Sequence, residues 1–281
     1  MASCTPLRTL WTVEGSPVAE PSSQHLDTNT PHSARLWNYW LGGKDNFQPD
    51  RDAGDAIAGM LPSIVALARE DRKFLRRSVE YMVGEGGIRQ ILDIGTGLPT
   101  ADNTHQVAQA VAPETKVVYV DNDPLVLVHA RALLAGSAEG ETSYVEADLN
   151  TPESILAAAR DTLDFSQPIA LTLLGIVHFL RDDDAALAVV RELVGALAPG
   201  SYLAIAHGCH DINTAEAHRI VDFWNERGTP KIKYRSAAEI TAFFDGLRLL
   251  EPGVVPCNQW RPDAKTGTED VNQYCGVAIK E

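Results

Sequence analysis

Cysteine, basic residues and long apolar runs are all scarce in this sequence of 281 residues. The four cysteines lie far apart and form no C-x-x-C pair, which excludes the usual zinc and dithiol spacings and favours a reducing compartment. No apolar stretch approaches the roughly 20 residues of a membrane-spanning helix, and no signal-peptide pattern opens the chain. We therefore expect a cytoplasmic protein with no metal site and no membrane partner.

Positive charge is also in deficit. The chain has 24 Lys and Arg against 38 Asp and Glu, a formal net charge of −14 at pH 7. Such a surface repels nucleic acid at long range, so a nucleic-acid partner needs a strong local exception. The best basic cluster, residues 69–77, is interleaved with acidic residues opposite an apolar stripe, the pattern of a solvated helix face. We expect a small-molecule substrate and no nucleic-acid partner; a homo-oligomer is possible but not indicated.

Apolar residues, by contrast, are plentiful, and their content of 44% is enough for one large core with an appendage. Residues 1–31 carry Pro, Ser and Thr with little apolar periodicity and are expected to form a disordered tail. Residues 32–85 are expected to form an N-terminal helical cap. Residues 86–281 are expected to form one α/β domain.

In the expected cap, an aromatic cluster precedes a glycine pair. Trp37, Tyr39 and Trp40 come just before Gly42 and Gly43, which predicts a helix that ends in a loop. The segment either staples the N-terminal helices to the core or forms a lid over a ligand. Periodicity does not separate these two interpretations.

From residue 88 onward, short apolar runs alternate with amphipathic segments, the pattern of a parallel sheet with crossover helices. The expected strands are 89–94, 116–121, 142–146, 169–174 and 201–207. The expected helices are 101–111, 124–135, 152–162, 183–196, 214–226 and 237–244. Two further strands, 247–251 and 276–280, have no helix-length crossover between them, so we expect them to form an antiparallel hairpin.

A glycine turn with the sequence D-I-G-T-G, residues 93–97, ends the first expected strand. Such a turn brings bare backbone up to a ligand at the carboxyl end of the sheet. A carboxylate about 20 residues beyond the glycines binds the ribose hydroxyls of nucleotide-like cofactors, and Asp121 ends the next strand at about that spacing. The candidate cofactor-binding residues are therefore Asp93, Gly95, Thr96, Gly97, Asp121 and Asn122.

The glycine spacing also distinguishes between cofactors. A dinucleotide fingerprint would need glycine at position 100 or, in a shorter variant, at position 99, where Thr100 and Pro99 stand. S-adenosylmethionine has no pyrophosphate, and its ammonium suits a carboxylate such as Asp93. The pattern therefore favours S-adenosylmethionine, with a ligand-free tight turn as the alternative.

Two further candidates follow expected strands. Asp148, with Leu149 beside it, can accept a hydrogen bond from an adenine amino group, or it can cap the next helix. His178 comes shortly after Gly175, which allows close approach to a transferred group. An imidazole of near-neutral pKa suits general-base work, but a core histidine bonded to backbone is equally consistent with the sequence.

Two long motifs carry a resemblance to a known family. The stretches SARLWNYWLGGKDN, residues 33–46, and LDIGTGLPTADNT, residues 92–104, resemble the signatures of the bacterial S-adenosyl methyltransferase family, formerly a domain of unknown function. The strand ends YVDNDP and ADL resemble the wider class I S-adenosylmethionine-dependent methyltransferases. The resemblance runs from about residue 33 to the C-terminus. It implies a Rossmann-like class I methyltransferase sheet, mostly parallel with an antiparallel C-terminal strand, plus the helical cap.

The resemblance also implies residue roles. Asp93, Gly95 and Gly97 would contact the methionine part of the cofactor, Asp121 the ribose, and Asp148 with Leu149 the adenine. Residues 33–46 would cover the cofactor, which favours the lid interpretation for Tyr39 and Gly43. No substrate or catalytic base is implied, so the role of His178 is an inference from the residues alone.

The predicted function is methyl transfer from S-adenosylmethionine to an unidentified small molecule, with S-adenosylhomocysteine as the product. One alternative is a non-catalytic protein that binds the cofactor for regulation. A less favoured alternative is an NAD-dependent Rossmann oxidoreductase, against which Pro99 and Thr100 argue.

Overall fold

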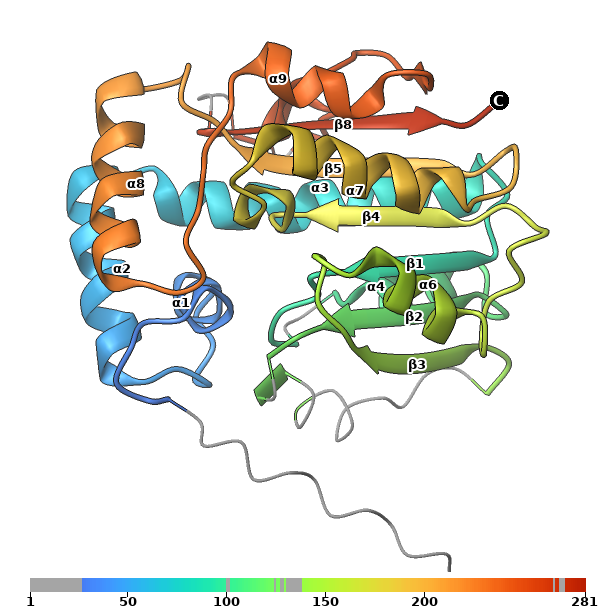
Figure 1. Ribbon diagram of the computed structural model, residues 1–281, viewed down its shortest axis with the longest axis horizontal. Coiled ribbons are helices and arrows are strands. Elements are labelled where there is room, and N and C mark those ends of the chain that lie inside the picture. The colour runs from blue at the N-terminus through green and yellow to red at the C-terminus, as the bar shows by residue number, and fades with distance from the viewer. Residues whose placement is uncertain are drawn as a thin grey trace, which may run out of the picture.

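The computed structural model describes residues 27–99, 102–123, 125–126, 129, 138–264, 266–267 and 271–281. Within these residues, eight strands form one sheet in the order β3-β2-β1-β4-β5-β8-β6, and β7 pairs with β8 (Figure 1). The strands are β1 (Gln90–Ile94), β2 (Lys116–Asp121), β3 (Glu141–Glu146), β4 (Ala170–Leu174), β5 (Tyr202–Gly208), β6 (Arg248–Leu249), β7 (Val255–Pro256) and β8 (Gln273–Ile279).

The sheet is mostly parallel, as predicted. Strands β1 to β5 pair in parallel, whereas β8 runs antiparallel to β5, β6 and β7. The predicted terminal hairpin exists as the β6–β8 pair, but β8 starts earlier than expected and lies between β5 and β6. This arrangement confirms the predicted Rossmann-like fold class with its antiparallel C-terminal strand.

The helices also follow the predicted order. They are α1 (Ser33–Trp40), α2 (Gln48–Met60), α3 (Ile64–Gly84), α4 (Thr104–Val111), α6 (Pro152–Ala159), α7 (Asp183–Gly195), α8 (Thr214–Arg227) and α9 (Ala237–Thr241), with short 3₁₀ helices η1 (Val177–Phe179), η2 (Ala242–Phe244) and η3 (Cys257–Gln259). Helix α4 begins later than expected because Gln106 accepts the backbone N–H of Asn103 and caps it there. Of the helix expected over 124–135, only residues 125, 126 and 129 are described, and they are helical; the rest lies outside the described residues.

Helices cover both faces of the sheet. Helices α3 and α4 lie on one face and α6, α7 and α9 on the other (Figure 1). Strand side chains alternate between two cores: Ile91 and Val117 belong to the core under α3, and Leu92 and Val118 to the core under α6 and α7. In the described part of the chain, no helix has the length and apolar character needed to cross a membrane.

Helices α1, α2 and α8 gather at the carboxyl ends of the parallel strands, on the left of Figure 1. A buried ion pair joins the first two, because Arg35 Nε donates to both carboxylate oxygens of Asp50 at 3.1 and 2.9 Å. Asp50 also accepts the backbone N–H groups of His32 and Phe47. These helices are therefore fixed to one another at the sheet edge where parallel α/β proteins bind ligands.

The basic cluster on α3 differs from the predicted solvated face. Arg72 donates to the backbone carbonyl of Asp102, and Arg77 donates to those of Trp260 and Cys257. Arg72 and Arg77 are half-buried. The cluster is partly a set of structural contacts, since helix periodicity alone does not show that a loop from the C-terminal region packs against this face.

Candidate functional site

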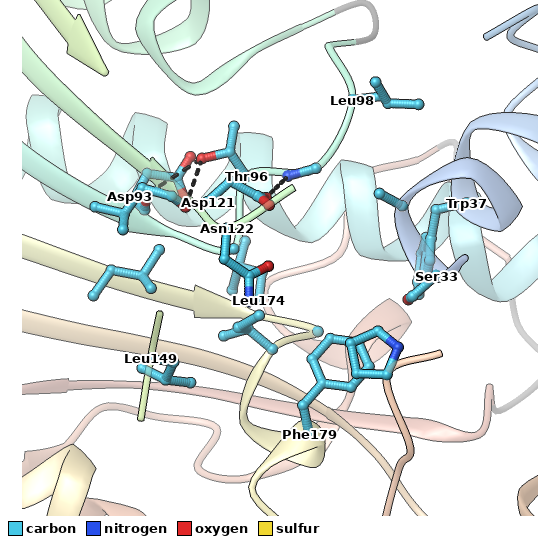
Figure 2. A pocket seen from close by; sticks show the side chains of 18 of the residues that line it. Ser33, Trp37, Asp93, Thr96, Leu98, Asp121, Asn122, Leu149, Leu174 and Phe179 are labelled. Carbon is cyan, nitrogen blue, oxygen red and sulfur yellow. Dashed lines mark hydrogen bonds between the residues drawn. The ribbon is translucent and has the colours of Figure 1, made fainter. Parts of the chain in front are cut away.

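A cleft of about 1320 Å³, open solvent at its mouth included, lies at the carboxyl ends of the parallel strands. Its walls come from the turn after β1, the ends of β2, β3 and β4, and helices α1 and α3. Figure 2 shows Asp93, Asp121, Asn122 and Leu149 on one side, with Ser33 and Trp37 across from them. The predicted residues that line it are Asp93, Gly95, Thr96, Gly97, Asp121, Asn122, Asp148 and Leu149.

The turn after β1 needs its two glycines for backbone reasons. Gly95 has φ +80° and Gly97 has φ +64°, a region that residues with a Cβ rarely adopt. A Cβ at Gly95 would also lie 2.7 Å from the side chain of Ile176. The Gly95 amide donates to the carbonyl of Val120 at 2.8 Å, which ties the turn to β2. The bare backbone therefore lies open along the cleft, as the sequence predicts.

Asp121 is held by the turn that it faces. Its Oδ2 accepts the Gly97 N–H at 2.8 Å, and its Oδ1 accepts the Asp123 N–H at 2.9 Å. Burial outweighs these hydrogen bonds and raises the pKa of the carboxyl to about 6. Each oxygen has a second lone pair available, so the oriented carboxylate fits the two hydroxyls of a ribose.

Asp93 connects the structural elements around the turn. Its oxygens accept hydrogen bonds from the hydroxyls of Thr104 and Thr172, both at 2.6 Å. The side chain is only 5% exposed, and burial raises its pKa. Asp93 therefore joins the start of α4, β1 and β4, while still lining the place predicted for the methionine part of the cofactor.

The end of β3 offers an apolar surface with a polar rim. Leu149 is buried in the cleft wall, and Asp148 accepts hydrogen bonds from Asn122 Nδ2 at 2.9 Å and from the Asn150 amide at 2.8 Å. Burial favours the neutral acid, but these hydrogen bonds together lower the pKa of Asp148. The α6 N-cap is Thr151, so Asp148 has no helix-capping role here. An adenine ring with its amino group fits this surface.

Helix α1 covers the cleft through residues other than those expected. Trp37, Asn38 and Leu41 line it, whereas Tyr39 and Gly43 are not among the described residues that do so. Tyr39 instead donates its hydroxyl to Asp55 on α2 at 2.7 Å. A Cβ at Gly43 would lie 2.3 Å from the Asn38 side chain, so this glycine makes room for a cleft residue.

The start of α1 also reaches the far wall. His32 Nδ1 lies 3.1 Å from Asp123 Oδ2, which follows β2. Both residues are largely buried, and burial is the main cause that lowers the pKa of His32. This contact connects the N-terminal segment to the cofactor side of the cleft.

His178 is placed differently from the expectation. It lies in η1, is 7% exposed and lines a second cavity rather than the cleft. Burial, assisted by the charge of Arg235, lowers its pKa to about 3. The near-neutral pKa assumed for a general base is therefore not met, and His178 is a neutral imidazole that holds a proton weakly.

Asp71 is a cleft residue that sequence reasoning missed. It accepts a hydrogen bond from Gln273 Nε2 at 2.7 Å, and burial raises its pKa to about 6. One signal was available: Asp71 stands four residues from Leu67 and four from Leu75, on the buried stripe of α3. A carboxylate on an apolar stripe needs a polar partner, so it is a better site candidate than its charged neighbours suggest.

The fold and the site together define a class I methyltransferase architecture with a cleft for an adenosyl cofactor. A glycine turn, a buried carboxylate at the end of β2 and an apolar surface after β3 all line one space. The match to the S-adenosyl methyltransferase family covers residues 19–281, and the chain belongs to that family. The predicted family is thus confirmed, and S-adenosylmethionine is the cofactor.

Two solved bacterial proteins are similar over nearly their whole length. A DUF574 family protein from Streptomyces avermitilis is 46% identical, with 91% of this chain and 99% of that chain covered and a TM-score of 0.88. A protein from Thermobifida fusca is 39% identical, with 91% and 97% covered and a TM-score of 0.84. Among curated proteins, none matches the chain.

Proposed function

We propose that this protein catalyses methyl transfer from S-adenosylmethionine to a small molecule in the bacterial cytoplasm. The observation that carries the proposal is the shape of the cleft, which continues beyond the predicted cofactor contacts. Past the turn after β1, it extends along Gly175, Ile176 and Phe179 beneath Trp37 of α1. A cofactor with its adenine at Leu149 would leave this end for an acceptor.

The residues of the chain would bind, orient and shield the reactants. Asp121 would hold the ribose, Leu149 would pack on the adenine, and Asp93 with Asp71 would attract the ammonium of the methionine part. The bound cofactor would supply an electrophilic methyl group on its sulfonium, and the remainder would leave as a neutral thioether when the bond from sulfur to the methyl carbon breaks. Trp37 and its neighbours would exclude water, so alignment and exclusion supply most of the rate enhancement.

The charge of the chain supports a small acceptor. With a net charge of −14, the protein repels nucleic acid at long range. The pairing of Arg72 and Arg77 with backbone carbonyls further reduces the basic surface available to phosphates. The origin of both similar structures in bacteria supports a bacterial source.

The test is transfer of a labelled methyl group from S-adenosylmethionine into a fractionated cell extract by the purified full chain. We expect label in the small-molecule fraction, and a loss of that label with Asp121→Ala but not with the exposed control Asp161→Ala. Label confined to RNA or protein would overturn the acceptor class. Cofactor binding without transfer to any fraction would overturn the catalytic assignment.

A further inference from the structure

A second cavity adjoins the cleft beneath α1 and α8. This inner pocket holds about 520 Å³ with its mouth included, and Ser33 and Trp37 line both spaces. Most of its wall is apolar and rich in aromatic rings, contributed by Trp40, Trp224 and Ile220 among others. An apolar, aromatic lining with a few polar atoms is typical of small-molecule sites.

Two polar atoms in this apolar wall lack partners. His178 Nδ1 and Gln273 Oε1 are buried without a hydrogen bond to any described residue. Their side chains are only 7% and 2% exposed, and both line the inner pocket. Buried polar atoms in folded proteins almost always form hydrogen bonds. Two unpaired atoms around one cavity therefore indicate that a ligand forms hydrogen bonds with them.

Both residues that carry these atoms also neighbour residues of the cleft. The Nε2 of Gln273 donates to Asp71, a cleft residue, at 2.7 Å. The His178 ring stands 3.9 Å from where a Cβ would lie on Gly175, another cleft residue. A ligand group bonded to these atoms would therefore sit where the two cavities meet, and the rest of the ligand would fill the apolar part.

The chemistry of the two atoms limits the ligand group. The amide oxygen of Gln273 only accepts hydrogen bonds, and a neutral imidazole nitrogen can accept one as well. A hydroxyl or amino group on the ligand satisfies Gln273, whereas an ether or a methyl group does not. The tryptophan walls suit an aromatic ring, which gains from edge-to-face and offset contacts.

We propose that the inner pocket binds the methyl acceptor as a single-ring aromatic compound whose hydroxyl or amino group donates to Gln273 Oε1. The inference rests on the proposed function, since it assigns the acceptor site of the same reaction. It places the acceptor group at the junction with the cleft, where the cofactor methyl is expected.

The test uses 4-fluorophenol and 4-fluoroanisole as probes, titrated by ¹⁹F NMR into the full-length protein saturated with S-adenosylhomocysteine. We expect 4-fluorophenol to bind roughly tenfold more tightly than 4-fluoroanisole, because one hydrogen bond to a buried acceptor contributes about that much to affinity. Gln273→Met should bring the two affinities to within about twofold of each other, whereas the exposed control Gln167→Met should leave the difference intact.

A second variant tests the location without touching the polar atoms. Ile220→Phe on α8 fills the inner pocket and should weaken 4-fluorophenol at least roughly tenfold, since the ring then has no space. Val221→Phe, on the same helix but outside the pocket lining, is the matched control. Equal binding of both probes, or 4-fluorophenol binding that survives Ile220→Phe, would overturn the inference. Failure of 4-fluorophenol to bind protein that holds S-adenosylhomocysteine would also overturn it, whereas failure of S-adenosylhomocysteine itself would refute the proposed function.

Discussion

The cofactor side and the proposed acceptor side of the active region are built in different ways. On the cofactor side, the key contact joins Gly97 to Asp121, 24 residues apart, across two adjacent parallel strands. Where the cleft meets the proposed acceptor side, the contact between Asp71 and Gln273 spans 202 residues and joins α3 to the last strand. A site at adjacent strand ends follows from sheet topology, whereas a site between lid helices and a distant strand depends on packing.

The largest effect should come from the ion pair that holds the lid helices. Asp50→Ala leaves the buried guanidinium of Arg35 without its carboxylate, and we expect a loss of about 3–5 kcal/mol in the free energy of unfolding. Urea denaturation measures it, with the exposed Asp52→Ala on the same helix as control. A loss below about 1 kcal/mol would show that the acceptor side is held loosely, contrary to the burial of this pair.

The next effect should fall on the cofactor side. Asp121→Ala removes the carboxylate proposed to bind the ribose, so binding of S-adenosylhomocysteine should weaken by roughly 1.5–3 kcal/mol, the size of a charge-assisted hydrogen bond. Calorimetric titration measures the change, and Asp161→Ala should leave the affinity unaltered. An unchanged affinity for Asp121→Ala would place the ribose elsewhere.

Two Gly→Ala variants compare a position where the backbone requires glycine with one where it does not. Gly95→Ala forces a Cβ onto Ile176 in a positive-φ conformation, and we expect a stability loss of about 2 kcal/mol. Gly59→Ala in the exposed part of α2 meets no described atom within 4 Å and should stabilise the protein by about 0.5–1 kcal/mol. Thermal unfolding of both variants gives the two signs. A neutral Gly95→Ala would mean that the turn is not fixed before cofactor binds.

The pH dependence of cofactor binding should be weaker than the effect of removing Asp121. The pKa of Asp121 is raised to about 6, so lowering the pH through that value protonates the carboxyl and removes its charge. Affinity for S-adenosylhomocysteine should therefore fall about tenfold from pH 7 to pH 5. Asp121→Asn should flatten the profile, apart from the contribution of Asp71, whose pKa is also about 6. Constant wild-type affinity over this range would argue against an ionised Asp121 at the ribose.

The sequence predicted the sheet and its strand-end residues because two physical rules act locally. Short apolar strands that alternate with crossover helices form a parallel sheet. The carboxyl ends of its strands then lie at one edge of the sheet, which brings residues such as Asp93 and Asp121 together. The stretch 33–46 contributes residues to the cleft wall, but the rotation of α1 about its axis decides which of its side chains do so. Trp37 rather than Tyr39 therefore lines the cleft.

The environment of a side chain was harder to predict than its position. His178 follows β4 as expected, yet the surrounding apolar groups and Arg235 lower its pKa to about 3, and these neighbours come from distant segments. Asp71 was hidden among charged residues of α3, although its place on the buried stripe distinguishes it. Burial of a charge is decided by what packs on it, which local periodicity does not contain.

Gln273 connects the two cavities, because its amide nitrogen donates to Asp71 in the cleft while the residue also lines the inner pocket with an unpaired amide oxygen. If both cavities bind as proposed, a ligand that reorients this amide in one space changes the free energy of occupancy in the other. Linkage then requires reciprocity: the factor by which S-adenosylhomocysteine changes the Kd of 4-fluorophenol must equal the factor for the reverse titration. One side chain on the last strand would thus couple the two reactants before any bond is made or broken.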